Sequence, residues 1–260
     1  MSKMAAFLGL GVMVGPTLGG LVASKSGNPK YTALFAVFAS LAQAAFIYNS
    51  FEESLDTEKR KKGVDWASCS PFTFLQMFSK TAKMRALSFL NIAQSVPVDM
   101  HDVRMVLLKT KIGMTTDQVS VYMLGNGLSA MVSGAVGAKL YAALGGTVQT
   151  TVSHAFSIAE FFLWAWAGSV GAVGSALALG VVGGQKGIST NARLTIEGAN
   201  AGMGKGQVAA SIAQMSNVCK IVFPFTFASL FARYGQATPF YLAAASMVLS
   251  EWLQRAVPQN

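Results

Sequence analysis

Charged residues are scarce in this chain, and so are cysteine and histidine. Only 12% of the residues are Asp, Glu, Lys or Arg, about half of what a soluble domain carries. Cys69 and Cys219 form neither a Cys-x-x-Cys pair nor a disulfide framework, and His101 lies far from His154 in sequence. The chain also lacks a nucleophile motif and a glycine-rich phosphate loop. The sequence therefore predicts no enzyme, no cofactor and no metal site.

Apolar residues are abundant and lie in long runs. They make up 52% of the chain, more than a core closed in water can use. A helix needs about 20 apolar residues to cross the hydrocarbon core of a bilayer. Such stretches occur at 4–23, 31–50, 86–108, 118–142, 148–168, 170–191, 207–232 and 237–257. We expect an all-α, polytopic membrane bundle of about eight transmembrane helices, with the lipid bilayer as its first partner.

The positive charge of the chain is distributed between the apolar stretches. A net charge of +9 can indicate nucleic-acid binding, but Lys and Arg between membrane spans are what cytoplasmic loops require. With the N-terminus inside, most of these residues fall on the cytoplasmic side. The sequence therefore predicts no nucleic-acid partner and a multi-pass protein with both termini in the cytoplasm.

One connection is much longer than the others, at residues 51–85. It opens with the charged run Glu52-Glu-Ser-Leu-Asp-Thr-Glu-Lys-Arg-Lys-Lys62, which is typical of a solvated linker. It continues with Ser70-Pro-Phe-Thr-Phe-Leu-Gln-Met-Phe78 and then with basic residues. Apolar bulk followed by basic residues favours a helix at the cytoplasmic membrane surface.

The first apolar stretch carries a pattern of small residues, G-x-x-x-G-P-x-x-G-G. Gly11, Gly15 and Gly19 are four residues apart and form one flat helix face, with Pro16 and Gly20 beside it. Small residues let two helix backbones approach closely in a bilayer. This segment resembles the antiporter motif in the fifth helix of major facilitator superfamily transporters, especially the drug:proton antiporter and tetracycline-resistance-like branch. The alternative is a generic packing face of a polytopic protein.

The resemblance implies a division of the chain and a function. Residues 1–50 would be the last two helices of an N-terminal bundle, 51–85 the cytoplasmic linker with an interfacial helix, and 86–260 a six-helix C-terminal bundle. Family helices one to four would be missing, so the sequence would be a short protein, a truncated gene model or one part of a split transporter that needs those helices or a partner chain. The implied function is secondary transport by alternating access, with proton-coupled exchange or export of a small organic solute. The alternative is a non-transporting membrane protein, such as an assembly partner or a dominant-negative fragment.

Polar side chains inside the apolar stretches are the candidate functional residues, because an intramembrane charge is costly unless it faces a cavity or a partner. Lys220 forms a slanting stripe with Gln214 and Asn217, which favours a cavity, although a salt bridge or snorkelling also fits. Glu160 lies among aromatic residues, where desolvation suits a proton carrier, but a structural hydrogen bond fits equally. His154 we expect to be a packing residue. The predicted solute or ion path comprises Gln94, Asp99, Asp102, Glu160, Lys186, Asn217 and Lys220.

The stretch 86–108 holds the densest polar group. Asp99 and Asp102 are three residues apart and share a face, and Pro97 predicts a break just before them. The group fits an outer gate or a substrate-contacting cluster, and it also fits an ion-pair cluster at a wet helix end. Lys186 and Gln185 fall in what the resemblance implies is a cavity-lining helix, and for them a functional and a structural role are equally open.

Overall fold

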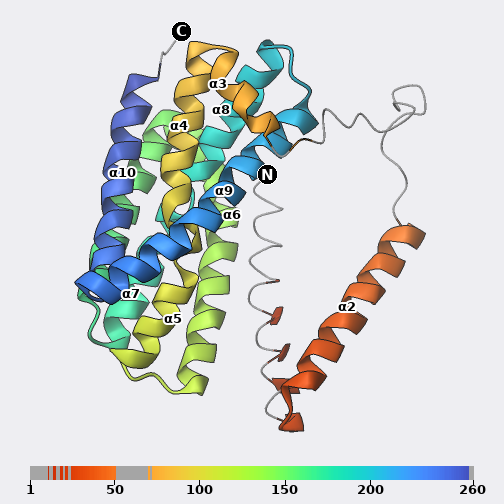
Figure 1. Ribbon diagram of the computed structural model, residues 1–260, viewed down its shortest axis with the longest axis vertical. Coiled ribbons are helices and arrows are strands. Elements are labelled where there is room, and N and C mark those ends of the chain that lie inside the picture. Colours follow the sequence, from red (N-terminus) through yellow and green to blue (C-terminus); the bar gives the residue numbers. More distant parts are fainter. Residues whose placement is uncertain are drawn as a thin grey trace.

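The structure, a computed structural model, describes residues 25–50, 70 and 72–257, together with positions 11, 14, 15, 18, 19, 21 and 22. Every regular element in these residues is helical, which confirms the all-α prediction. The elements are α2 (Pro29–Ser50), η3 (Thr73–Leu75), α3 (Gln76–Ser79), α4 (Ala82–Ser95), η4 (Val96–Asp99), α5 (His101–Thr110), α6 (Thr116–Trp166), α7 (Val170–Gly183), α8 (Lys186–Asn200), α9 (Lys205–Tyr234) and α10 (Thr238–Ala256). The elements from η3 onward form one elongated bundle (Figure 1).

The predicted span 86–108 is a broken helix. α4 ends at Ser95, the 3₁₀ turn η4 contains Pro97, and α5 resumes at His101. Proline removes a backbone donor and its ring clashes with the preceding turn, so the α-helical ladder cannot run through this point. The predicted break at Pro97 is confirmed.

The predicted spans 118–142 and 148–168 are the two arms of α6. The backbone reverses at Gly145, where φ is +74°, in the left-handed region that favours glycine. Gln149 donates to the carbonyl of Gly137 at 3.1 Å, and the rings of Tyr122 and Trp164 meet edge-to-face at 5.8 Å. Both pairs straddle the reversal, so the two arms run antiparallel.

The predicted span 170–191 is divided as well. α7 ends at Gly183, a turn follows at Gly184 and Gln185, and α8 continues to Asn200, beyond the predicted limit. The last two predicted spans agree closely with α9 and α10. Discontinuous helices at membrane depth are tolerated where they are buried in protein or line a cavity.

The interior of the bundle is layered along its length. One apolar cluster, around Met84, Leu194 and Val208, joins α3, the start of α4, the end of α8 and the start of α9. A second, around Trp164 and Phe240, joins α5, the ends of α6, the start of α7 and the start of α10. Buried polar side chains form a layer of their own: Gln94 and Gln185 lie in sequence between members of the two clusters, and Gln149, His154, Ser157 and Glu160 are buried on the second arm of α6. The site described below belongs to this polar layer.

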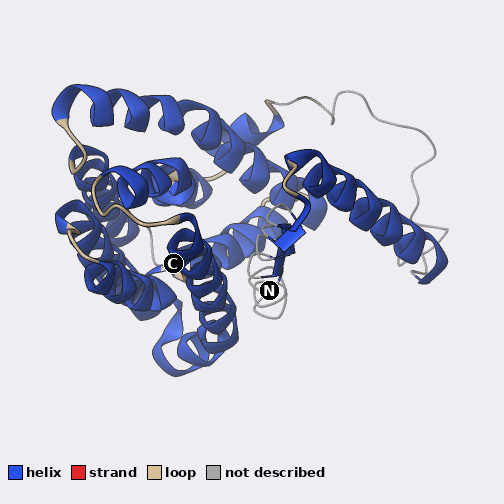
Figure 2. Ribbon diagram, turned by 90° about the horizontal axis from the view of Figure 1, so that it is seen from below, coloured by secondary structure: helices blue, strands red, loops and turns tan. Residues whose placement is uncertain are grey.

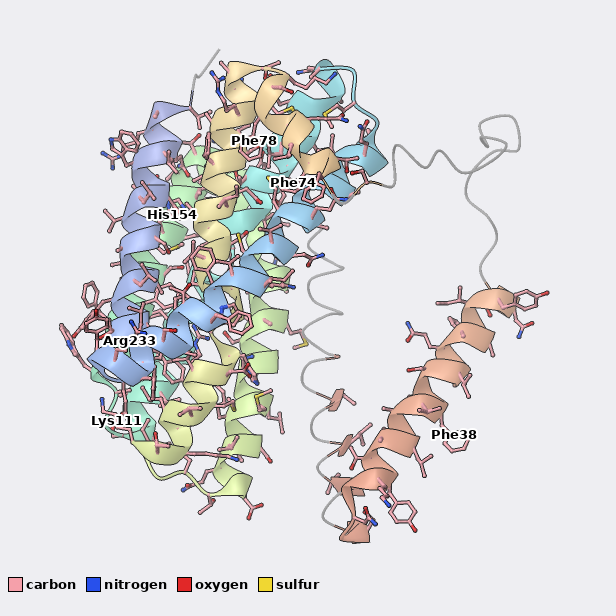
Figure 3. All side chains as sticks on the ribbon, in the orientation of Figure 1. Phe38, Phe74, Phe78, Lys111, His154 and Arg233 are labelled. Atoms are coloured by element: carbon pink, nitrogen blue, oxygen red, sulfur yellow. The ribbon has the colours of Figure 1, made fainter. Side chains whose placement is uncertain are left out.

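The N-terminal helix α2 lies beside the bundle in both views (Figures 1 and 2). Its apolar side chains are exposed, and Phe38, labelled in Figure 3, is 68% exposed. Within the described part of the chain, three helical stretches are long and apolar enough to cross a membrane. They are Lys30–Ser50 in α2, Asp117–Trp166 in α6 and Lys205–Tyr234 in α9. An exposed apolar helix of this length requires lipid or another chain around it.

The small-residue motif falls partly outside the described residues, which include neither Pro16 nor Gly20. Side-chain carbons built on Gly11 and Gly15 would meet no described atom within 4 Å. One built on Gly19 would lie 3.4 Å from the methyl group of Thr32, whose hydroxyl donates to the Gly19 carbonyl. The close packing expected of this face therefore stays a prediction, as does the interfacial linker over residues 51–69, which are not described.

Candidate functional site

A cavity of about 330 Å³ opens between α4, α8 and α9. Its wall combines apolar and small residues with six polar side chains. These are Asn91, Gln94 and Ser95 from α4, Lys186 and Asn191 from α8, and Ser216 from α9. Two of the predicted path residues, Gln94 and Lys186, therefore lie in the same cavity. Its size and mixed lining suit a small organic molecule.

Each of the three helices lines the cavity with polar or small residues on one of its faces. On α4, Asn91, Gln94 and Ser95 are three and four residues apart and so share one side of the helix. On α9, the cavity-lining Ala209 and Ala213 are small, which leaves room between the helices. Asn91 Nδ2 donates to Asn191 Oδ1 at 2.8 Å and ties α4 to α8 at the wall.

Lys186 is the cation of the cavity. It begins α8 next to the turn at Gly184, and its Nζ donates to the Ser157 hydroxyl at 3.3 Å and to the Gly183 carbonyl at 3.2 Å. None of the salt bridges among the described residues includes Lys186. Glu160 is close enough to attract it electrostatically, but that carboxylate is paired elsewhere. The ammonium is thus left without a direct anionic partner at the edge of a cavity.

Glu160 is held by Arg104, which the sequence analysis did not include in the path. Arg104 Nη2 lies 2.8 Å from Glu160 Oε1, and the two side chains are 18% and 9% exposed. The guanidinium also lies 5.1 Å from the centre of the Trp164 ring, within cation–π range. A carbon added at Gly180 would meet the Glu160 carboxylate at 3.5 Å, an ordinary van der Waals distance, so α7 packs directly against the pair. This arrangement favours the structural alternative for Glu160 over the proton carrier.

A second polar network crosses the layer from α4 to α10. His154 Nε2 lies 2.9 Å from Gln94 Nε2, and His154 Nδ1 lies 3.0 Å from Glu251 Oε2. The other oxygen of Glu251 accepts from Thr151 at 3.1 Å and from Arg255 at 3.0 Å. The sequence analysis missed Glu251, although an acid inside the apolar stretch 237–257 was a sufficient signal. It also treated His154 as a packing residue, whereas the structure places its ring between Gln94 on α4 and Glu251 on α10.

Among the other predicted path residues, Asp102, Asn217 and Lys220 do not line this cavity. Asp102 is exposed and borders a separate hollow of about 360 Å³, lined also by residues of α9 near Pro224. Asp99 lies in η4, and its side chain is not described. Asn217 and Lys220 are exposed and border none of the pockets described here.

The polar stripe expected on α9 is divided between two faces. Gln214 turns to the segment before α4, where its Oε1 accepts from the Thr73 hydroxyl at 2.9 Å and from the Phe74 amide at 3.2 Å. Lys220 follows the cavity-lining Ala213 and Ser216 at helical spacing and so shares their face. The roles predicted for Asn217 and Lys220 stay predictions. Among the described residues, no group of three or more His, Cys, Asp or Glu side chains could hold a metal ion.

Comparison with known proteins finds a solved structure with the same fold. No family model matches the sequence, and no curated protein matches it. The crystal structure of the human organic anion transporter MFSD10 (TETRAN) superimposes with a TM-score of 0.75 at 19% sequence identity. The chain therefore has a major-facilitator-like fold. The match covers 98% of this chain and 62% of the transporter, so the chain spans less than two thirds of that protein's length.

Proposed function

We propose that this chain forms the membrane-embedded helices five to twelve of a major facilitator secondary transporter. Residues 1–50 complete an N-terminal bundle, 51–85 are the cytoplasmic linker, and 86–260 are the C-terminal bundle. Both termini face the cytoplasm, and four further helices or a partner chain complete the transporter. Support comes from the TM-score of 0.75, from the 62% coverage of the matched transporter and from the exposed apolar surface of α2.

The solute of this transporter is a small organic anion. The observation that carries this proposal is Lys186, an ammonium at the cavity wall that is bound by a hydroxyl and a carbonyl and by no carboxylate among the described residues. A cation removed from water requires a counter-charge, and an anionic solute in the cavity supplies it. Asn91, Gln94 and Ser216 add neutral hydrogen-bonding groups at the same wall. The matched transporter is itself described as an organic anion transporter.

The solute path extends from the cavity along one face of α9. Lys220 shares the face of Ala213 and Ser216, and Asp102 borders the second hollow beyond it. The breaks at Pro97 and Gly184 lie at the cavity or next to it, as in transporters whose discontinuous helices form the solute site. Alternating access would expose this face to one side of the membrane and then to the other.

A binding measurement on the purified chain tests the anion site. Benzoate serves as a probe because it carries one carboxylate and one apolar ring. We expect Lys186→Gln to weaken benzoate binding by about tenfold or more, because hydrogen bonds to charged groups contribute about 1.5–3 kcal/mol. Lys205→Gln is the matched control, since Lys205 is exposed at the start of α9.

Equal benzoate binding by the Lys186→Gln variant and the unaltered chain would overturn the site assignment. Failure of the unaltered chain to bind benzoate would count against an anion carrier and favour the non-transporting alternative. Binding that Lys220→Gln also weakens would support the path along α9.

A further inference from the structure

His154 lies between α4 and α10 (Figure 3), with a different partner on each ring nitrogen. It is 1% exposed. Its Nε2 faces the amide nitrogen of Gln94, which can only donate, so this ring nitrogen accepts the hydrogen bond. The ring proton is then on Nδ1 and is donated to the Glu251 carboxylate. This arrangement fits a neutral imidazole that is protonated on Nδ1 and whose Nε2 lone pair accepts a hydrogen bond from the Gln94 amide.

The same three side chains can hold one more proton. If a proton from water adds to the lone pair of Nε2, the ring becomes an imidazolium and both nitrogens donate. The Gln94 amide must then turn by half a rotation so that its Oε1 accepts. That oxygen is buried and has no hydrogen-bond partner in the described part of the chain. The rotation replaces the hydrogen bond from the Gln94 amide nitrogen to Nε2 with one from the imidazolium Nε2–H to Oε1, an oxygen that otherwise has no partner in the described part of the chain, so the site accommodates the protonated ring.

We propose that His154, held between Glu251 and Gln94, is a proton-binding site coupled to the anion cavity. The proposal rests on the proposed anion-carrier function. Gln94 is the physical link, because it contacts the His154 ring and also lines the cavity. Glu251 fixes the ring orientation and compensates the imidazolium charge, so it is a positioning residue.

The charges around His154 determine the sign of the coupling. α10 presents Glu251, which also binds Arg255, and α8 presents Lys186, which is close enough to interact with the ring electrostatically. α4 contributes the neutral Gln94, and α7 contains no ionisable residue. Protonation changes the net charge of the His154–Glu251 pair from −1 to 0, which makes the cavity more attractive to an anion. By linkage, the bound anion increases the proton affinity of His154 by the same factor.

This coupling corresponds to cotransport of proton and anion in one direction. It differs from the exchange that the resemblance of the Gly-Pro motif implied. A carrier that binds both ligands together and releases both together moves no net charge for a monovalent anion, which eases the passage of the loaded site through the membrane.

Nitrogen-15 NMR of the full chain labelled at histidine tests the proton site directly. The chain has two histidines, so two rings contribute, and His101→Gln leaves the signal of His154 alone. His101 is exposed, so this substitution is also the matched control. We expect the His154 ring to be the neutral Nδ1–H tautomer at about pH 8 and to become an imidazolium on acidification. Glu251→Gln should move its midpoint to lower pH, because the compensating carboxylate is lost.

Benzoate added to the same samples tests the coupling. We expect it to raise the midpoint of His154 by about one pH unit, and we expect benzoate affinity to be about tenfold higher at about pH 5 than at about pH 8. The ligand remains largely ionised there, since carboxylic acids lose their proton near pH 4. In His154→Gln the affinity should no longer vary with pH, whereas His101→Gln should behave as the unaltered chain.

Three other outcomes would overturn parts of the proposal. A His154 ring that stays neutral through the acid range overturns the proton site. A ring that titrates at the same midpoint with and without bound benzoate overturns the coupling and leaves the anion-carrier function intact. Absence of benzoate binding at every pH overturns the anion-carrier function together with the coupling.

Discussion

The Arg104–Glu160 pair offers a quantitative test of how the polar layer is built. Glu160→Gln keeps the volume of the side chain, so the packing of α7 against this position at Gly180 is preserved. It removes the negative charge opposite Arg104, whose side chain is only 18% exposed. Removing one partner of a buried ion pair costs about 3–5 kcal/mol.

We expect a smaller loss for this substitution. Arg104 retains some solvent contact, and the new amide oxygen can still accept one of its hydrogen bonds. We therefore estimate that the free energy of unfolding falls by about 2–3 kcal/mol. For a chain of this size the melting temperature should fall by roughly 4–12 °C. Tryptophan fluorescence of the detergent-solubilised protein measures it, and Trp164 is a local reporter because Arg104 lies over its ring.

Two further variants make this test decisive. Asp117→Asn is the control, because Asp117 is an exposed acid in the first turn of α6, where a carboxylate contributes under about 1 kcal/mol. The double variant Arg104→Leu with Glu160→Leu should recover much of the lost stability, since no charge is then left buried. A melting temperature of Glu160→Gln equal to that of the unaltered chain would refute the ion pair as a structural element and restore Glu160 as a candidate proton carrier.

Three other predictions concern packing and topology. Gly183→Leu should lower the melting temperature sharply, because even a first side-chain carbon there would lie 2.7 Å from the Ser157 hydroxyl; an unchanged value would mean that α6 and α7 can separate. Gln214→Leu should expose η3 to protease while the bundle stays folded, because Gln214 binds both Thr73 and the following amide, and unchanged cleavage would contradict this anchoring role. A cysteine at Lys61 should react with membrane-impermeant reagents only after cell lysis; labelling in intact cells would reverse the proposed orientation.

The sequence by itself determined the membrane character and most of the helices. The predicted spans 207–232 and 237–257 agree closely with α9 and α10. The break at Pro97 was predictable too, since a proline disrupts a helix wherever it falls inside one. These features depend on local properties, namely the length of an apolar run and the backbone chemistry of single residues.

The site was predictable only in part. The rule that polar residues inside apolar stretches are functional candidates selected Gln94, Lys186 and Glu160, which the structure buries in the polar layer or at the cavity wall. It gave no pairing between them, because contact across the bundle depends on how each helix is rotated about its axis. Arg104 and Glu160 are 56 residues apart, and a change of a few residues in helical register would separate them.

Tertiary structure decided which polar residues belong together. It assigned Gln214 to the segment before α4 rather than to the stripe with Lys220, and it brought the unexpected Glu251 to His154 from a helix 97 residues away. Buried polar atoms need hydrogen-bond partners, and the packing of the helices decides which side chains are near enough to serve. The sequence determined that such groups are buried in an apolar bundle, and the arrangement of the helices determined their partners.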